Sequence, residues 1–260
     1  MDNVNKTLYI PLYGKAYVSR LGILLRDAKA EQIWAAESFP LKGKSRSKWL
    51  AYYMGMRAAE IERWVQAQMD SHPDAIVLHI GCGMDSRAER VGHPGHLWLD
   101  LDFPEVIHER SRYYRESENY RMIPADIRDP RWLEPVPTGG PAVVVMEGVS
   151  MYLRPEELKQ LFRDLNSHFS QAHLLMDCYT EFAARVSRVK NPVNDVGVTQ
   201  VYGLDDPRVP EPEAGLSFVK EWDMTPPALV SELQGMERAI FKALYAGRFA
   251  RKLYRLYEYG

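Results

Sequence analysis

The sequence has few cysteines, no long apolar run and no excess of charge of either sign. No uncharged apolar stretch approaches the ~20 residues that a membrane-spanning helix needs, so we do not expect an integral membrane protein. The charges of the 33 basic and 35 acidic residues nearly cancel, so the chain lacks the excess of positive charge that is typical of proteins that bind nucleic acid or an anionic membrane. We therefore expect a small molecule or another protein as the partner.

Cysteine and histidine give no sign of a metal site. Cys82 and Cys178 both lie in apolar, strand-like segments, where small buried thiols are common, and we interpret both as packing residues. Neither has another cysteine or a histidine at zinc-ligand spacing. His93 and His96 are separated by Pro94-Gly95 in a predicted turn, so we expect both at the surface. No metal is predicted.

The opening segment, MDNVNKTLYIPLYGK, does not resemble a signal peptide. Its second residue is acidic, and no long apolar core precedes a small-residue cleavage site. We therefore predict a cytoplasmic protein. At 260 residues the chain is large enough for one substantial domain and small for two, so residues 1–260 are expected to form a single domain.

Strand and helix patterns alternate along most of the chain. A helix over 48–70 carries an apolar stripe at steps of three and four residues, and short apolar runs between turn residues predict strands. The predicted strands are 75–81, 96–102, 120–123, 141–148, 173–179, 217–223 and 253–259. Further helices are predicted at 86–91, at 104–118, from Pro155, over 181–190 and from about Ala228, with an irregular loop at 191–215.

This order of elements predicts an α/β fold with a doubly wound, Rossmann-like sheet. The sheet should be mostly parallel, with an antiparallel hairpin formed by the last two strands. Residues 74–260 would form this core, and residues 1–73 would pack on it as a helical lid or cap. In such sheets the ligand binds at the carboxyl ends of the strands, so the residues that follow each strand are the candidates.

Candidate ligand-binding residues follow four of the predicted strands. Gly81 and Gly83 permit a tight turn and a close approach of ligand to backbone, although an ordinary strand-to-helix turn has the same pattern. Asp102 lies about 20 residues later, where a carboxylate can bind ribose hydroxyls or cap the next helix. Asp126 could accept a hydrogen bond from an exocyclic amine or lie in a solvated turn. Glu147 follows four apolar residues, where a carboxylate is costly without a partner, and this favours a functional role.

Four segments stand in the order and spacing of one known family: IVLHIGCGMDSRAER, LDFPEVI, PADIRDPRW and VVVMEGVSMYL. Together they resemble the leucine carboxyl methyltransferase family, in particular its bacterial branch of polyketide O-methyltransferases. The segment TLYIPLYGKAYVSR is similar to the opening of that branch, so the resemblance covers residues 7 to about 180 well and the rest in outline.

The resemblance implies a class I methyltransferase with S-adenosylmethionine as its cofactor. It implies eight cofactor-binding residues: Lys15 and Arg57 at the methionine carboxylate, Gly81 and Gly83 beneath the cofactor, Asp102 at the ribose, Asp126 and Ile127 at the adenine, and Glu147 near the amino group or the sulfonium. Many class I methyltransferases carry an acid and a third glycine where this chain has His79 and Asp85, which leaves the details of the loop open. We interpret His79 as a core histidine.

Transfer of a methyl group requires alignment of the attacking atom and does not require a metal. A carboxylate acceptor is already ionised at neutral pH, whereas a hydroxyl benefits from a positioned base, commonly histidine. All seven histidines lie at or before His173, which favours a methyl ester on a small, polyketide-like metabolite. A phenol or hydroxyl acceptor and, as for eukaryotic members of the family, a protein C-terminus are the alternatives.

Aromatic and methionine side chains are weaker candidates for contact with the acceptor, because each such residue is more often a packing residue. They are Tyr13, Tyr17, Met151, Tyr152, Tyr179, Tyr202 and Trp222. Tyr9, Tyr13 and Tyr17 recur at four-residue spacing, which would put three phenols on one face of a helix in the lid.

Two functional hypotheses outside the methyltransferases are less favoured. A nicotinamide-dependent oxidoreductase also uses GxG and a later acid, but GCGMDS lacks the third glycine, and a dinucleotide does not need both Asp126 and Glu147. A non-catalytic protein that kept the fold and the cofactor site is the other alternative. The sequence makes no prediction of oligomeric state.

Overall fold

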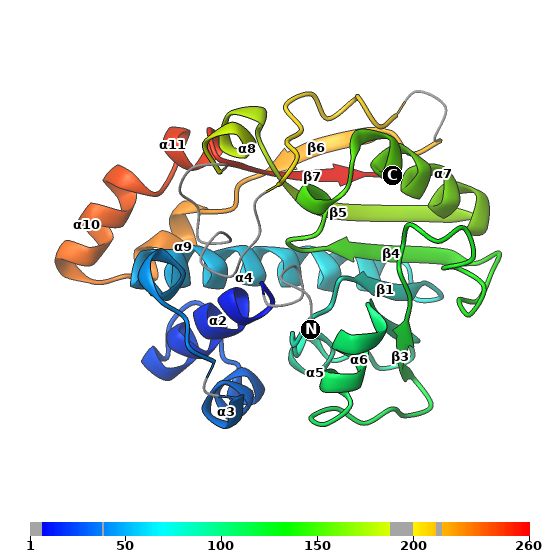
Figure 1. Ribbon diagram of the computed structural model, residues 1–260, viewed down its shortest axis with the longest axis horizontal. Helices are drawn as coiled ribbons and strands as arrows, with labels where there is room; N and C mark the ends of the chain where they lie inside the picture. The colour runs from blue at the N-terminus through cyan, green and yellow to red at the C-terminus, as the bar shows by residue number, and fades with distance from the viewer. Residues whose placement is uncertain (1–6, 38, 188–199, 212–214) are drawn as a thin grey trace.

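The computed structural model describes residues 7–37, 39–187, 200–211 and 215–260, and within them a seven-stranded sheet has the order β3-β2-β1-β4-β5-β7-β6 (Figure 1). The strands are β1 (Ile76–Ile80), β2 (Trp98–Asp102), β3 (Tyr120–Pro124), β4 (Pro141–Met146), β5 (Gln171–Tyr179), β6 (Phe218–Trp222) and β7 (Tyr254–Tyr259). The first five strands pair in parallel, whereas β7 is antiparallel to both β5 and β6. The predicted doubly wound sheet with its antiparallel C-terminal strands is confirmed.

Helices precede the sheet and connect its strands. The first group is α2 (Tyr9–Leu21), α3 (Ala28–Glu37), the 3-10 helix η1 (Gly43–Arg46) and α4 (Lys48–Ser71). Between strands lie α5 (Arg87–Val91), α6 (Pro104–Arg110), the 3-10 helix η2 (Ser150–Tyr152), α7 (Pro155–His168), α8 (Glu181–Ser187), α9 (Pro227–Glu232), α10 (Gly235–Leu244) and α11 (Arg248–Arg251). No helix in the described ranges is both long and apolar enough to cross a membrane.

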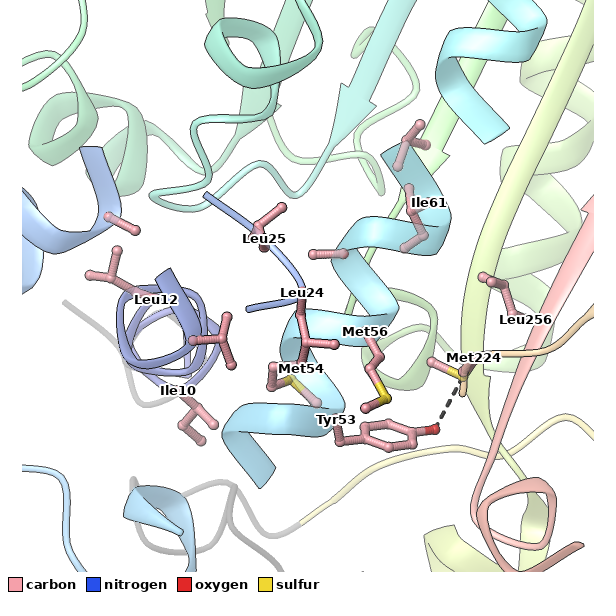
Figure 2. Packing of buried hydrophobic residues seen from close by; sticks show 14 of the residues in the cluster. Ile10, Leu12, Leu24, Leu25, Tyr53, Met54, Met56, Ile61, Met224 and Leu256 are labelled. Atoms are coloured by element: carbon pink, nitrogen blue, oxygen red, sulfur yellow. Dashed lines mark hydrogen bonds between the residues drawn. The ribbon is translucent and has the colours of Figure 1, made fainter. Parts of the chain in front are cut away.

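Alternate residues of the strands face two separate hydrophobic layers. Val77 and Val143 pack in the layer that contains the apolar side chains of α2, α3 and α4. Leu78, the neighbour of Val77, faces the opposite layer, to which α7 contributes. Figure 2 shows part of the first layer, where the Tyr53 hydroxyl donates a hydrogen bond to the Met224 sulfur at 3.2 Å.

The long helix α4 joins the N-terminal helices to the sheet. Its predicted apolar stripe is buried, and consists of Met54, Ala58, Ile61, Val65 and Met69. Arg57 lies beside this stripe and is only 3% exposed, so a charged side chain enters the interior from the same helix. A buried guanidinium requires carboxylate partners, which leads to the site described below.

Several predicted boundaries differ from the structure. The helix predicted at 104–118 ends at Arg110, because the chain turns there and Tyr114 is anchored by a hydrogen bond from its hydroxyl to the Met84 carbonyl at 2.9 Å. Strand β3 extends to Pro124, which an edge strand tolerates because no ladder hydrogen bond is lost on its open side. The helix predicted from Ala228 is divided into three, with Gly235 at a positive φ of 50° after the first break.

The predicted loop at 191–215 lies partly outside the described residues, as do residues 188–190 of the helix predicted at 181–190. Its described residues, 200–211 and 215, form no helix or strand beyond one isolated bridge between Gly203 and Tyr179.

The order of the strands reverses between β1 and β4. From β1 the chain proceeds outward through β2 to β3, and it then returns to place β4 on the other side of β1. Adjacent connections leave the sheet in opposite directions at such a point, which opens a crevice outside the carboxyl ends of the two strands. The sheet therefore places a ligand site after Ile80 and after Met146.

Candidate functional site

A cavity of about 270 Å³ lies at this reversal point. One water needs only ~10–15 Å³ of such volume, so the cavity has the size of a ligand site and not of a packing defect. The described residues that line it include all eight predicted cofactor-binding residues: Lys15, Arg57, Gly81, Gly83, Asp102, Asp126, Ile127 and Glu147. The structure thus brings these residues together, and their individual roles remain predictions.

The turn after β1 forms the floor of the cavity. Gly81 and Gly83 have φ angles of 68° and 50°, which side-chain-bearing residues rarely adopt. A Cβ atom on Gly81 would also collide with the Val149 side chain. The Gly81 N–H donates to the Leu101 carbonyl at 2.7 Å and ties this turn to β2. Both glycines are therefore required by the backbone geometry, which lets the chain pass close to a ligand.

Asp102 ends β2 and faces the cavity from beside the glycine turn. Its carboxylate accepts hydrogen bonds from the backbone N–H groups of Gly83 and Phe103, each at 2.8 Å. Desolvation nevertheless dominates and raises the pKa of Asp102 to about 6. Asp100 points away from the cavity and is fully buried, where its carboxylate accepts hydrogen bonds from Trp98 and other side chains. Asp102, and not Asp100, is thus the carboxylate available to a ligand.

Asp126 and Ile127 line the cavity after β3. The Asp126 carboxylate is held by Arg128, with an ion pair of 2.6 Å, and this hydrogen bonding lowers the pKa of Asp126. The alternative of a solvated turn is also partly realised, because the Asp126 side chain is 33% exposed. Any ligand amine would therefore share this carboxylate with Arg128.

Lys15 and Arg57 reach the cavity from α2 and α4 and meet at Glu147. The Lys15 ammonium lies 3.2 Å from a Glu147 oxygen, and the Arg57 guanidinium donates to the same oxygen at 2.8 Å. Although burial opposes ionisation, Lys15, Arg57 and Arg87 hold the pKa of Glu147 below its ordinary value. Arg57 also donates to Asp177 at 2.5 Å, and Asp177 accepts from the Gly148 N–H at 2.6 Å.

Three charged residues that the sequence did not assign to the site extend this network. They are Asp85, Arg87 and Asp177, of which Arg87 and Asp177 are fully buried. Arg87 pairs with Glu147 and lies 3.2 Å from an Asp85 oxygen. The burial argument that identified Glu147 also applies to Asp177, since Asp177 stands in the apolar segment LLMDCY.

Part of the cavity lining is aromatic and apolar. Met151, Tyr152 and Tyr179 line the cavity, and their contact with the acceptor stays a prediction; Tyr254, which was not predicted, lines it from the start of β7. The Tyr254 hydroxyl donates to the Tyr179 hydroxyl at 2.8 Å, and the two rings meet edge to face at 4.5 Å. Antiparallel pairing of β5 with β7 brings these two phenols together.

Two of the predicted acceptor contacts in the lid are not found among the residues that line the cavity. Tyr13 and Tyr17 lie on α2 at the expected spacing, but Tyr13 packs against Trp34 at 5.1 Å and Tyr17 against Tyr52 at 6.0 Å. Helical spacing puts these phenols near each other, and the orientation of the helix turns them toward other helices. Tyr9 likewise stacks on Phe39.

Tyr202 and Trp222 also lie outside the cavity lining. The Tyr202 hydroxyl accepts a hydrogen bond from Gln200 at 2.9 Å. The Trp222 indole N–H on β6 donates to Glu258 at 2.7 Å. Strand β6 is an edge strand separated from β5 by β7, so its side chains are too far along the sheet to reach the site.

His79 lines the cavity, but both of its ring nitrogens are occupied. Nδ1 lies 3.1 Å from an Asp100 oxygen and Nε2 lies 3.3 Å from the Arg87 guanidinium. Burial lowers the pKa of His79, so it is a neutral core histidine as predicted.

His96, expected at the surface, is instead buried, with Nδ1 at 2.8 Å from the Ala75 carbonyl. No group of three potential metal ligands occurs in the described residues.

Comparisons with known proteins agree with this geometry. The family model of leucine carboxyl methyltransferase matches residues 11–166. The tetracenomycin polyketide synthesis O-methyltransferase TcmP of Streptomyces glaucescens is 30% identical, over 98% of this chain and 97% of its own length. An S-adenosyl-L-methionine-dependent methyltransferase of Gibberella zeae, dpfgK, is 28% identical over 64% of this chain and 60% of its own.

Among solved structures, the magnesium protoporphyrin IX methyltransferase of Synechocystis with bound SAH has a similar fold. Its TM-score is 0.55 at 12% identity, with 89% of this chain and 94% of that chain covered. At this identity the similarity establishes the fold alone, which is the Rossmann-like methyltransferase fold.

Proposed function

The chain belongs to the leucine carboxyl methyltransferase family, and we propose that it forms a methyl ester on a carboxylate of a small, polyketide-like molecule. It is an S-adenosylmethionine-dependent O-methyltransferase. The cofactor supplies a methyl group activated on a sulfonium. The residues of this chain must bind the cofactor, orient the acceptor and exclude water.

The charges of the cavity fit a zwitterionic cofactor that carries a nucleoside. We assign the methionine carboxylate to Arg57 and Lys15. Two of the Arg57 nitrogens bind Asp177 and Glu147, while its buried Nε has no hydrogen-bond partner within the described ranges. A guanidinium has five N–H donors, so Arg57 keeps capacity for a further carboxylate.

The nucleoside end is assigned to the residues after β1, β2 and β3. Gly81 and Gly83 would lie beneath the cofactor, and the Asp102 carboxylate would accept hydrogen bonds from the ribose hydroxyls. Asp126 and the backbone of Ile127 would bind the adenine. Glu147 would lie beside the amino group of the methionine portion, where it also holds Lys15 and Arg57.

The acceptor is assigned to the aromatic and apolar part of the cavity lining, and the observation that supports a carboxylate is that the side chains of this part supply no base of their own. The apolar and aromatic residues of this part are Leu50, Met54, Met151, Tyr152, Tyr179 and Tyr254. Burial raises the pKa of Tyr152 and of Tyr254, so both phenols stay protonated at neutral pH. A carboxylate attacks without losing a proton, whereas a phenol would need a base.

The apolar and aromatic lining also supports a small, flat acceptor, as does the similarity to TcmP, a tetracenomycin polyketide synthesis O-methyltransferase. We further propose that the N-terminal helices form a lid over a single-domain core. Leu8 supports this, because its Cβ lies only 3.4 Å from where a Cβ on Gly83 would be. A lid that excludes water would hold the acceptor oxygen in line with the methyl group.

The test uses a naphthalene ring that carries one carboxyl and one hydroxyl group as the acceptor, with S-adenosylmethionine labelled in the methyl group. We expect label in a product from which mild alkali releases volatile methanol, since methyl esters hydrolyse and aryl methyl ethers do not. An alkali-stable product would overturn the carboxylate assignment in favour of a hydroxyl. A peptide with a free C-terminal carboxylate is assayed in parallel. Label in this peptide, but in neither the ester nor the ether of the naphthalene acceptor, would favour a protein acceptor.

A further inference from the structure

Asp85 is a buried carboxylate within the site to which no ligand contact has been assigned. It follows the glycine turn, and its side chain is only 7% exposed. Its oxygens lie 2.7 Å from the Lys15 ammonium, 2.8 Å from Arg90 and 3.2 Å from Arg87. Three cations around one carboxylate offset the cost of burying it, so Asp85 is ionised in the folded protein.

The three cations differ in how much they depend on Asp85. Arg90 also pairs with Glu62 and Asp27, and Arg87 also pairs with Glu147. Lys15 has two ion-pair partners in the described residues, Asp85 and Glu147, and Asp85 is the nearer of the two. Loss of Asp85 would therefore leave the arginines paired but would release Lys15 to a single partner.

The geometry of Lys15 explains what this pairing does for the cavity. An ammonium has three N–H donors and no acceptor. Two carboxylates, one from the turn after β1 and one from the turn after β4, lie within ion-pair distance of the ammonium, and neither Asp85 oxygen accepts a hydrogen bond within the described residues. The two negative charges hold the ammonium electrostatically from two directions, which leaves N–H donors available to the cavity that Lys15 lines.

We propose that Asp85 is a positioning residue, whose negative charge holds the Lys15 ammonium where its N–H donors meet the carboxylate of the methionine portion of the cofactor. The inference rests on the proposed function, in which Lys15 binds that carboxylate. Without Asp85, the flexible lysine side chain would turn toward Glu147 alone, and both its charge and its free donor would be withdrawn from the ligand. Asp85 would then act on affinity through Lys15 and not by touching the cofactor.

The test compares two ligands that differ only at the methionine end. Calorimetric titrations measure the Kd of S-adenosylhomocysteine and of 5′-methylthioadenosine, which lacks the amino-acid portion. Asp85→Asn should raise the Kd of S-adenosylhomocysteine by ~10-fold or more, which is the loss of affinity expected for one charge-assisted hydrogen bond. The Kd of 5′-methylthioadenosine should change by less than about twofold.

Two further variants separate this inference from the proposed function. Lys15→Met should produce the same selective loss, and adding Asp85→Asn to Lys15→Met should cause little further loss, because the two residues act in series. Glu62→Gln is the matched control, since Glu62 belongs to the same network through Arg90 but does not contact Lys15. Glu62→Gln should leave both Kd values within about twofold of the wild type.

The outcomes are distinct. Suppose that Lys15→Met raises the Kd of S-adenosylhomocysteine alone. If Asp85→Asn then raises neither Kd, or raises both equally, the positioning role is wrong and the cofactor site stands. If Lys15→Met leaves the ratio of the two Kd values unchanged, Lys15 does not bind the carboxylate, and both proposals fail at this residue. Thermal unfolding establishes that each variant is folded. If Asp85→Asn does not fold, Asp85→Glu keeps the charge but moves it, and should still show a smaller loss confined to S-adenosylhomocysteine.

Discussion

Cofactor affinity should depend on pH through the carboxyl group of Asp102. Desolvation by burial raises the pKa of Asp102 to about 6, so this group loses its charge within the range of ordinary buffers. In the proposed role the ionised form would accept hydrogen bonds from the ribose hydroxyls, and protonation would remove an acceptor. Affinity should therefore fall as the pH decreases through 6.

The size of the effect follows from the fraction of protein with Asp102 ionised. With a pKa of about 6 that fraction is close to one at pH 8 and about one-eleventh at pH 5, so the apparent Kd should rise about tenfold between these values. Asp100 lies nearby, but Arg110 and other partners keep its pKa at about 2 despite burial, so it does not titrate in this range. Calorimetric titration with S-adenosylhomocysteine at pH 5, 6, 7 and 8 measures the dependence.

Asp102→Asn is the matched control, because its side chain carries no charge at any of these pH values. The variant should bind more weakly than the wild type at pH 8, with a Kd that varies little with pH. A wild-type Kd that stays constant from pH 8 to pH 5, or a variant that keeps the full pH dependence, would refute the assignment of Asp102 to the ribose.

Three substitutions test other parts of the site. Gly81→Ala should abolish measurable binding of S-adenosylhomocysteine. Gly139 is also at positive φ, but a Cβ added there would meet open space, so Gly139→Ala should only lower the melting temperature. Arg57→Met should lower the free energy of unfolding, measured in urea, by about 3–5 kcal/mol, because it leaves buried carboxylates without their cation. Arg131→Met, at the exposed surface, should barely change this free energy. Equal effects of the two arginine variants would contradict the network. Tyr13→Phe should leave kcat and KM unchanged in a methylation assay, since its hydroxyl bonds a backbone carbonyl outside the cavity, and a rise in KM for the acceptor would show that the lid face had been misassigned.

The residues at the strand ends could be predicted because their positions depend on local sequence. Gly81, Asp102 and Glu147 each follow a short apolar run, and parallel strands bring their carboxyl ends to one edge of the sheet. Lys15 and Arg57 were predicted only through the family resemblance, because nothing in a helical pattern says which polar side chain is turned inward.

The missed residues depend on contacts between distant segments. Tyr254 reaches the cavity because β7 pairs with β5 in one particular register, which sets Tyr254 opposite Tyr179. Asp85 and Arg87 belong to a polar stretch after a turn, and such residues are usually solvated. They are buried here because helices α2 and α4 cover that turn, a fact of tertiary packing that local patterns do not contain.

The order of the last three strands also affects how the chain folds during synthesis. Strand β7 follows β6 in the sequence but lies between β5 and β6 in the sheet, so β6 lacks its native partner until β7 has left the ribosome. A nascent chain that has emerged only through β6 therefore exposes the unpaired edge of β5, a surface on which other chains can add a strand. Insertion of β7 closes that edge and delivers Tyr254 to the cavity in the same event.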